Sequence, residues 1–302
     1  MVNAIVLGHC CAELVGLQKM HNHLYSCARE RRAISSVGRA PRLHRDGRKF
    51  ESCIAHSNIV ETKRKQNPIW TSQSPCYTPR MAEPFSGDDK AVKILCFGDS
   101  ITFGAWDTQG GWVDRLKRTV FQKSITSELR YWGTVSNEGI SGDTSEDVLK
   151  RLSRELESNT WPGEELTILI AVGTNDSAER MKTGEPWIPL DDYRKNMHAI
   201  AEVARSHAQK IACLGTTPVD DTKTIPTLWD PEWRYMDARS KEYERALQDV
   251  CEAERVPFLS LREALADHDL DAILYDGLHP NDLGHQLIYE HVYHWLEGRE
   301  WV

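Results

Sequence analysis

Residues 166–176, Leu-Thr-Ile-Leu-Ile-Ala-Val-Gly-Thr-Asn-Asp, decide the fold of this chain. An apolar run of strand length, interrupted here only by Thr167, is typical of a strand buried on both faces, because a half-exposed strand alternates apolar and polar residues. Strands of this kind occur in parallel sheets that helices cover on both sides. The run ends at a Gly-Thr-Asn sequence, which predicts a tight turn at the carboxyl end of the strand.

Apolar runs of strand length alternate with amphipathic runs of helix length on both sides of this segment. We expect further strands near 93–97, 129–135, 210–215 and 257–261, and helices near 111–121, 144–156, 191–208, 232–254 and 282–296. This alternation predicts an α/β sandwich around a parallel sheet. No internal repeat is visible in the sequence.

Four short polar motifs follow these apolar runs or lie in late loops. They are residues 98–101 (GDSI), 137–144 (NEGISGDT), 173–176 (GTND) and 276–280 (DGLHP). Ligands of open parallel sheets bind beyond the carboxyl ends of the strands, where the strand order reverses. If the first strand lies between the second and the third, as in the flavodoxin-like order, the first three motifs meet at one point.

The first and last motifs supply a candidate nucleophile and base. Ser100 follows the Gly98-Asp99 turn and opens a helical turn, where free N–H groups favour negative charge. A serine hydroxyl needs a base to take its proton; His279 is the candidate, with Asp276 placed to receive the ring Nδ1–H. Taken singly, Gly-Asp-Ser also fits a helix N-cap, and Asp-Gly and His-Pro also fit turns.

The two middle motifs supply candidate oxyanion donors. Gly142 lets a backbone N–H approach a tetrahedral oxygen without a Cβ clash, and Asn175 offers a side-chain amide. The backbone N–H of Ser100 would be the third donor. Taken singly, Asn175 also fits an Asx-turn and Gly142 an ordinary loop glycine. We expect Asn137 and Asp176 to brace these loops rather than to touch the substrate.

Charge is distributed unevenly along the chain. Residues 1–80 hold 13 Lys and Arg against 5 Asp and Glu, whereas residues 81–302 hold 24 against 40. An acidic main domain argues against nucleic-acid binding, since phosphate recognition requires clustered Lys and Arg. We expect a small-molecule ester as the partner, with no nucleic acid, and the sequence leaves the oligomeric state open.

The cysteine pattern and the absence of long apolar runs predict a cytoplasmic protein. Cys96, Cys213 and Cys251 lie inside apolar runs and fit reduced, buried thiols better than disulfides. No run is long enough for a membrane span. The first residues also lack the basic segment and apolar core of a signal peptide.

We expect two parts: residues 1–85, a basic and disordered extension, and residues 86–302, the catalytic domain. The extension contains a group of possible metal ligands whose spacing matches none of the usual zinc patterns, namely His9, Cys10, Cys11, His21, His23 and Cys27. We therefore expect no metal and no cofactor.

An alternative explanation for the extension is that the reading frame begins too far upstream. Back-translated codons for residues 37–40 and 50–52 resemble the D-arm and the T-arm of a transfer-RNA gene. Gly38 and Phe50 are 12 codons apart, close to the spacing of those arms. Under this hypothesis translation starts at Met81.

From about residue 92 to 298 the chain resembles the SGNH (GDSL-type) hydrolases, which are named for Ser, Gly, Asn and His in four sequence blocks. Those four residues match Ser100, Gly142, Asn175 and His279 here, and Asp276 matches the family's triad aspartate. Residues 139–145 look especially like the thioesterase, lysophospholipase and arylesterase branch. The resemblance implies a three-layer α/β/α sandwich with a mostly parallel five-stranded sheet of flavodoxin-like order, and a metal-independent serine esterase.

The resemblance leaves the substrate open among small acyl, aryl and lysophospholipid-type esters. A carbohydrate O-deacetylase and an acyl thioesterase are alternatives on the same site, and a non-catalytic binding module is a rival class. We expect the 218–234 loop to set specificity. Five tryptophans could line an acyl or sugar pocket, although loop and helix tryptophans more often pack structurally; they are Trp106, Trp112, Trp187, Trp229 and Trp233.

Overall fold

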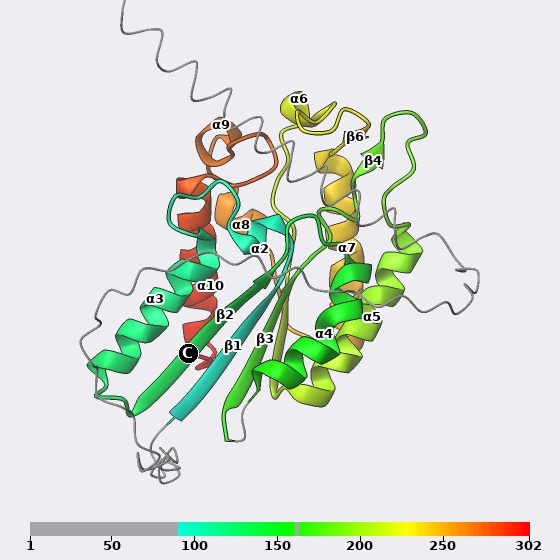
Figure 1. Cartoon of the computed structure of the whole chain (residues 1–302). Helices are drawn as coiled ribbons and strands as arrows, with labels where there is room; N and C mark the ends of the chain where they lie inside the picture. The colour runs from blue at the N-terminus through cyan, green and yellow to red at the C-terminus, as the bar shows by residue number, and fades with distance from the viewer. Residues whose placement is uncertain (1–89, 161–162) are drawn as a thin grey trace, which may run out of the picture. The chain divides into compact units, whose positions relative to one another are not determined.

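The computed structural model describes residues 90–160 and 163–302 (Figure 1). The predicted extension at residues 1–85, with its possible metal ligands and Met81, lies outside the described residues, so both explanations for it remain predictions. The described residues contain a five-stranded sheet in which all strand pairs are parallel. Its strands are β1 (Lys90–Gly98), β2 (Tyr131–Gly139), β3 (Glu165–Ala171), β5 (Lys210–Leu214) and β7 (Phe258–Leu259).

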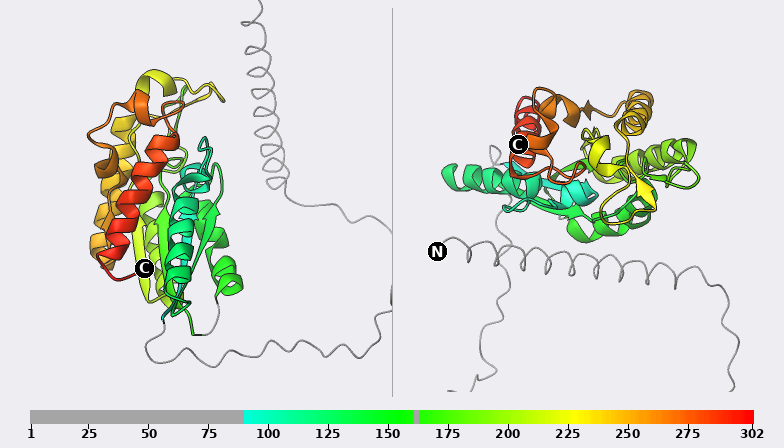
Figure 2. Two further views of the ribbon diagram at one scale, coloured as in Figure 1. Left: turned by 90° about the vertical axis from the view of Figure 1, so that its left-hand side faces the viewer. Right: turned by 90° about the horizontal axis from the view of Figure 1, so that it is seen from above.

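The strand order is β2-β1-β3-β5-β7, so β1 lies between β2 and β3 as the flavodoxin-like order requires. Helices cover both faces of the sheet (Figures 1 and 2). One face carries α3 (Gly111–Thr126) and α10 (Asp282–Glu297), and the other carries α4 (Ser145–Asn159), α5 (Leu190–His207) and α7 (Asp237–Glu254). The predicted three-layer α/β/α sandwich with a five-stranded parallel sheet is confirmed.

Strand β1 shows why the sheet has two covered faces. Its side chains alternate, so Ile94 and Cys96 join the core under α3 and α10, while Leu95 and Phe97 join the core under α4, α5 and α7. All four side chains are fully buried. Burying a large apolar side chain contributes about 1.5–3 kcal/mol to the free energy of folding, and the side chains on both faces of β1 make this contribution.

Short elements surround the carboxyl ends of the strands. They are α2 (Ser100–Phe103), α6 (Asp221–Thr224), α8 (Leu261–Leu265), α9 (Leu270–Ile273) and a two-stranded antiparallel pair of β4 (Glu179–Arg180) with β6 (Trp233–Arg234). In Figure 1, α2, α6, α9, β4 and β6 lie toward the same end of the sheet. Such elements are too short to show a helical or strand period in the sequence.

Two predicted boundaries were wrong for physical reasons. β2 continues to Gly139 because residues 136–139 pair with the end of β1, so Asn137 belongs to the strand and not to a loop. α7 begins at Asp237 and not near 232, because Trp233 and Arg234 pair with β4 instead of joining the helix.

The three cysteines of this domain, Cys96, Cys213 and Cys251, are free and buried, as predicted. Among the described residues, no helix combines the length and the apolar character needed to cross a membrane.

Candidate active site

Ser100 sits at the turn between β1 and α2. Asp99 is the N-cap of α2, and its Oδ1 accepts a hydrogen bond of 2.9 Å from the Ile101 N–H. A Cβ on Gly98 would lie 2.2 Å from Thr102 Oγ1, so only glycine allows this close turn. Asp99, and not Ser100, supplies the side-chain acceptor at the start of the helix, so the serine hydroxyl is available for another contact. As the first residue of α2, Ser100 also has a backbone N–H without an intrahelical partner.

The structure brings Ser100, His279 and Asp276 together. Ser100 Oγ lies 2.9 Å from His279 Nε2, and His279 Nδ1 lies 2.8 Å from Asp276 Oδ2. Ser100 and His279 are separated by 179 residues, yet they are only 6% and 4% exposed. A hydroxyl, an imidazole and a carboxylate in this order can pass a proton from the serine to the histidine.

Asp276 is held as a carboxylate by four donors. Its Oδ1 accepts from the Leu278 N–H at 3.1 Å and the His279 N–H at 2.9 Å, and its Oδ2 accepts from Trp106 Nε1 at 3.0 Å in addition to the His279 ring. Burial acts to raise the pKa of Asp276, but the hydrogen bonds and the charge of His279 hold that pKa below its usual value. An ionised carboxylate here orients the imidazole and stabilises its protonated form.

Asn175 and Gly142 lie in loops that contact each other. Asn175 Nδ2 donates to the main-chain oxygen of Asp143 at 2.9 Å, and Asn175 Oδ1 accepts from the Tyr235 hydroxyl at 2.9 Å. Gly142 has a φ of 86°, in the left-handed region that favours glycine. The structure therefore places the predicted oxyanion residues on neighbouring loops beyond β2 and β3.

Asn137 and Asp176 each make a hydrogen bond that links two elements of the site; that they do not touch the substrate stays a prediction. Asn137 Nδ2 donates to the Thr102 carbonyl at 2.9 Å, which ties β2 to the helix that carries Ser100. Asp176 accepts from the backbone N–H of Ser145 at 3.0 Å, which ties the end of β3 to the start of α4.

Sequence reasoning missed Arg151, which ties the 137–144 segment to α4. Its Nε donates to Asp143 Oδ2 at 2.8 Å, and its Nη2 donates to the Glu138 carbonyl at 2.7 Å. Arg151 lies within α4, where an arginine is unremarkable, so no local pattern signals its role. Tyr235 was also missed, because nothing near it in the sequence indicates its hydrogen bond to Asn175.

The five predicted tryptophans divide into two groups. Trp112 is fully buried in the core, and Trp187 stacks on Trp233 with ring centroids 4.9 Å apart. Trp106 and Trp229 instead flank His279, with ring centroids 6.3 Å and 5.5 Å from the imidazole. Trp229 comes from the 218–234 loop, so that loop reaches the base.

Buried acids surround the site. Burial raises the pKa of Asp99 to about 6 and that of Asp176 to about 7. The nearby His285 is fully buried, and burial lowers its pKa to about 4. His285 is therefore a neutral packing residue.

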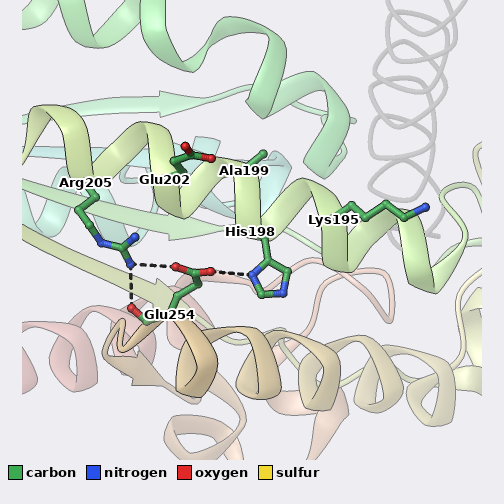
Figure 3. Close-up of a pocket in the computed structure, with 6 residues that line it drawn as sticks. All are labelled: Lys195, His198, Ala199, Glu202, Arg205 and Glu254. Atoms are coloured by element: carbon green, nitrogen blue, oxygen red, sulfur yellow. Dashed lines mark hydrogen bonds and ion pairs between the residues drawn. The ribbon is translucent and has the colours of Figure 1, made fainter.

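A hollow of about 530 Å³ lies elsewhere, between α5 and α7 (Figure 3). It is lined by Lys195, His198, Ala199, Glu202, Arg205 and Glu254. Glu254 pairs with both Arg205 and His198 across it. The hollow shares no residue with the Ser100 site. Among the described residues, no group of three or more His, Cys, Asp or Glu is arranged to hold a metal ion.

Residues 96–287 match the model of the GDSL-like lipase/acylhydrolase family. The chain is also similar to curated proteins. It is 26% identical over 221 residues to the isoamyl acetate-hydrolyzing esterase 1 homolog of Homo sapiens, covering 68% of this chain and 82% of that protein. It is 28% identical over 211 residues to the isoamyl acetate-hydrolyzing esterase of Saccharomyces cerevisiae, covering 66% and 83%.

Solved structures share this fold. A lipase/acylhydrolase from Enterococcus faecalis is 25% identical and superposes with a TM-score of 0.53, covering 69% of this chain and 96% of that one. A variant of an acetyl xylan esterase from Geobacillus stearothermophilus is 20% identical, with a TM-score of 0.51, covering 68% and 94%. The second likeness concerns the fold alone.

Proposed function

The chain belongs to the GDSL-like lipase/acylhydrolase family and is a carboxylic ester hydrolase, and we propose that it cleaves short-acyl esters through Ser100, His279 and Asp276. One observation carries the assignment of these residues. His279 lies within hydrogen-bond distance of both partners, 2.9 Å from the serine oxygen and 2.8 Å from the carboxylate. In this geometry Nε2 can take the proton of the serine, because the hydrogen bond between Nδ1 and the carboxylate fixes the tautomer of the ring.

In the proposed acylation step, Ser100 Oγ attacks the ester carbonyl carbon and its proton moves to His279 Nε2. The carbonyl double bond opens, and the oxygen takes the negative charge. The backbone N–H groups of Ser100 and Gly142 and the amide of Asn175 would donate to this oxyanion. When the oxyanion re-forms the carbonyl, the bond to the alcohol oxygen breaks. The alcohol leaves with the proton from His279.

In the proposed deacylation step, a water molecule gives its proton to His279 Nε2 and attacks the acyl carbon of the acyl-enzyme. The second oxyanion collapses, the bond to Ser100 Oγ breaks, and the serine recovers the proton from the imidazole. The acid product then leaves. Asp276 stabilises the imidazolium in both steps without itself taking up the proton.

Aromatic side chains around the base support a short acyl group. Trp106 and Trp229 approach His279 from two different segments of the chain. Large planar rings close to the base restrict the space beside the scissile bond. The name of the yeast relative gives the same direction, since isoamyl acetate is an ester with an acetyl group.

The surroundings of the site support an apolar alcohol. Phe103 and Ile140, which lie near Ser100 and Gly142 in the chain, are 56% and 47% exposed, and Tyr275, next to Asp276, is 61% exposed. Exposed apolar side chains near a site favour an apolar ligand over a carbohydrate.

The alternatives differ in the alcohol or thiol that leaves. A carbohydrate O-deacetylase would use the same triad with a polar surface for the sugar. A thioesterase for phosphate-bearing thiols would need free cations, but Lys223, which lies beside Gly277, already pairs with Asp220 and Asp271. A non-catalytic binding module would leave Ser100 unreactive.

A substrate panel tests the proposal. p-Nitrophenyl esters from acetyl to palmitoyl give the acyl preference, and isoamyl acetate, acetylated xylo-oligosaccharides and an acetyl thioester of a small thiol give the leaving-group preference. We expect the highest kcat/KM for two to four acyl carbons and for isoamyl acetate. A maximum at long acyl chains or for the acetylated oligosaccharide would contradict the proposal.

A further inference from the structure

The side-chain amide of Asn175 is held from both ends. Its nitrogen donates to the Asp143 carbonyl at 2.9 Å, and its oxygen accepts from the Tyr235 hydroxyl at 2.9 Å. A main-chain carbonyl can only accept, so the nitrogen must face Asp143 and the oxygen must face Tyr235. The two partners together determine which end of the amide points which way.

This orientation matters for the proposed chemistry. The amide nitrogen carries two hydrogens, and the bond to Asp143 uses one of them. The second is the one that would donate to the oxyanion. If the amide rotated, its oxygen would lie near the developing negative charge and would repel it. The reactivity of the site therefore depends on what fixes this side chain.

Tyr235 is itself fixed in place. Its backbone N–H donates to the Thr224 carbonyl at 3.2 Å, and Thr224 Oγ1 donates back to the Tyr235 carbonyl at 2.7 Å. The residue is 5% exposed, and its ring packs against Trp229 with centroids 6.2 Å apart. It belongs to a small apolar cluster that also contains Ala178 and Leu278.

From these contacts we propose that Tyr235 is a positioning residue that holds the Asn175 amide ready for the oxyanion. The inference rests on the proposed function of Asn175. Without the tyrosine hydroxyl, the buried amide oxygen would lose its donor, and an unsatisfied buried acceptor is unfavourable. The side chain would turn to recover a partner and would carry its nitrogen away from the oxyanion. The segment between Thr224 and Tyr235 would thus support both His279, through Trp229, and Asn175.

A double-mutant cycle separates this role from a purely structural one. Tyr235→Phe is measured in the wild-type and Asn175→Ala backgrounds with p-nitrophenyl acetate. We expect the substitution to lower kcat about tenfold in the wild type and to leave KM unchanged within about twofold. This loss of kcat is smaller than the roughly 10²–10³ that follows the removal of an oxyanion donor, because the donor is displaced and not removed. In the Asn175→Ala background we expect Tyr235→Phe to lower kcat by less than about twofold, because the effects of two residues that act through one another are not additive.

Tyr243→Phe is the matched control, because it removes another buried tyrosine hydroxyl, one that donates to the Ile188 carbonyl. It is expected to lower the melting temperature without lowering kcat. The same factor for Tyr235→Phe in both backgrounds would overturn the inference.

A crystal structure of Tyr235→Phe supplies a readout that does not depend on turnover. We expect the Asn175 amide to leave its contact with Asp143; an unchanged amide and an unchanged kcat would overturn the inference. Failure of the proposed function looks different, because turnover would then persist in Ser100→Ala while the orientation of the amide could still be observed.

Discussion

The indole N–H of Trp106 donates to Asp276 Oδ2 at 3.0 Å, the same carboxylate oxygen that faces the His279 ring. The two residues are 170 positions apart in the chain. Trp106 follows the short helix that carries Ser100, so this bond joins the segment of the nucleophile to the loop of the base. Trp106 has a φ of 65°, a left-handed conformation that costs a residue with a Cβ about 1–2 kcal/mol. Its hydrogen bond and its stacking on Tyr275 offset that cost.

Trp106→Phe tests the importance of this bond. We expect kcat/KM to fall about tenfold, because a hydrogen bond to a charged group is worth about 1.5 kcal/mol or more. The acid limb of the pH profile should move to higher pH, because a carboxylate with one donor fewer attracts the imidazolium more strongly. The measurement is kcat/KM between pH 5 and 9.

Trp112→Phe serves as the control for losing an indole. The Trp112 N–H is buried without a hydrogen-bond partner among the described residues, so this change alters packing alone. We expect it to lower stability and leave the shape of the pH profile unchanged. An unshifted acid limb in Trp106→Phe would argue against a role for the Trp106 bond.

Asn175→Ala should abolish most turnover without unfolding the protein. The loss of one oxyanion donor is expected to reduce kcat by roughly 10²–10³ with a small change in KM. Asn137→Ala is the comparison, because Asn137 braces the Ser100 helix through the Thr102 carbonyl. That variant should lose about 1 kcal/mol of stability and far less activity. Equal losses of kcat in the two variants would exclude the assignment of Asn175.

Gly142→Ala is predicted to impair both folding and chemistry. The φ of 86° makes any side chain at this position cost about 1–2 kcal/mol, and relief of that strain would move the backbone N–H. We expect a lower melting temperature and a kcat reduced by at least about tenfold. If kcat stayed at the wild-type level, the Gly142 N–H would not be an oxyanion donor.

Asp176 should make stability depend on pH. Burial raises its pKa to about 7, whereas an unfolded chain loses this proton near pH 4. Between these values the folded state binds more protons than the unfolded state, so stability falls as pH rises from about 4 to about 7. In Asp176→Asn no proton is exchanged there, and we expect a smaller decline of melting temperature across this range.

Asp191→Asn is the control for this pH experiment, because Asp191 is exposed. The melting temperature of this variant should decline with pH as that of the wild type does. Asp99 has a pKa raised to about 6 by burial, so some decline should remain in Asp176→Asn. An undiminished decline would show that Asp176 is not the group responsible.

The sequence was sufficient to predict the sheet and the contacts of Ser100, His279 and Asp276, because apolar runs of strand length and polar motifs at their ends are local features. The neighbours of β1 are those of the flavodoxin-like order, the condition under which the motifs were expected to meet. The exact start of α7 did not follow, since Trp233 and Arg234 are held by pairing with β4, a partner more than 50 residues away.

The supporting residues could not be predicted for a similar reason. Tyr235 and Trp106 act through single long-range side-chain hydrogen bonds, to Asn175 and Asp276. Arg151 instead donates to Asp143 and to the Glu138 carbonyl, both in the segment that precedes its helix. Only Arg151 lies within a long helix, and there an arginine is expected in any case. Contacts of this kind depend on the three-dimensional packing of loops and leave no period or spacing in the sequence.

The central claim is that Ser100 is the nucleophile of an ester hydrolase. The most direct test is p-nitrophenyl acetate hydrolysis by the wild type and Ser100→Ala, with mass spectrometry after treatment with a fluorophosphonate. The account predicts turnover and a single adduct on the Ser100 peptide in the wild type, and loss of both in Ser100→Ala. Turnover that survives in Ser100→Ala, or an adduct on another residue, would contradict it.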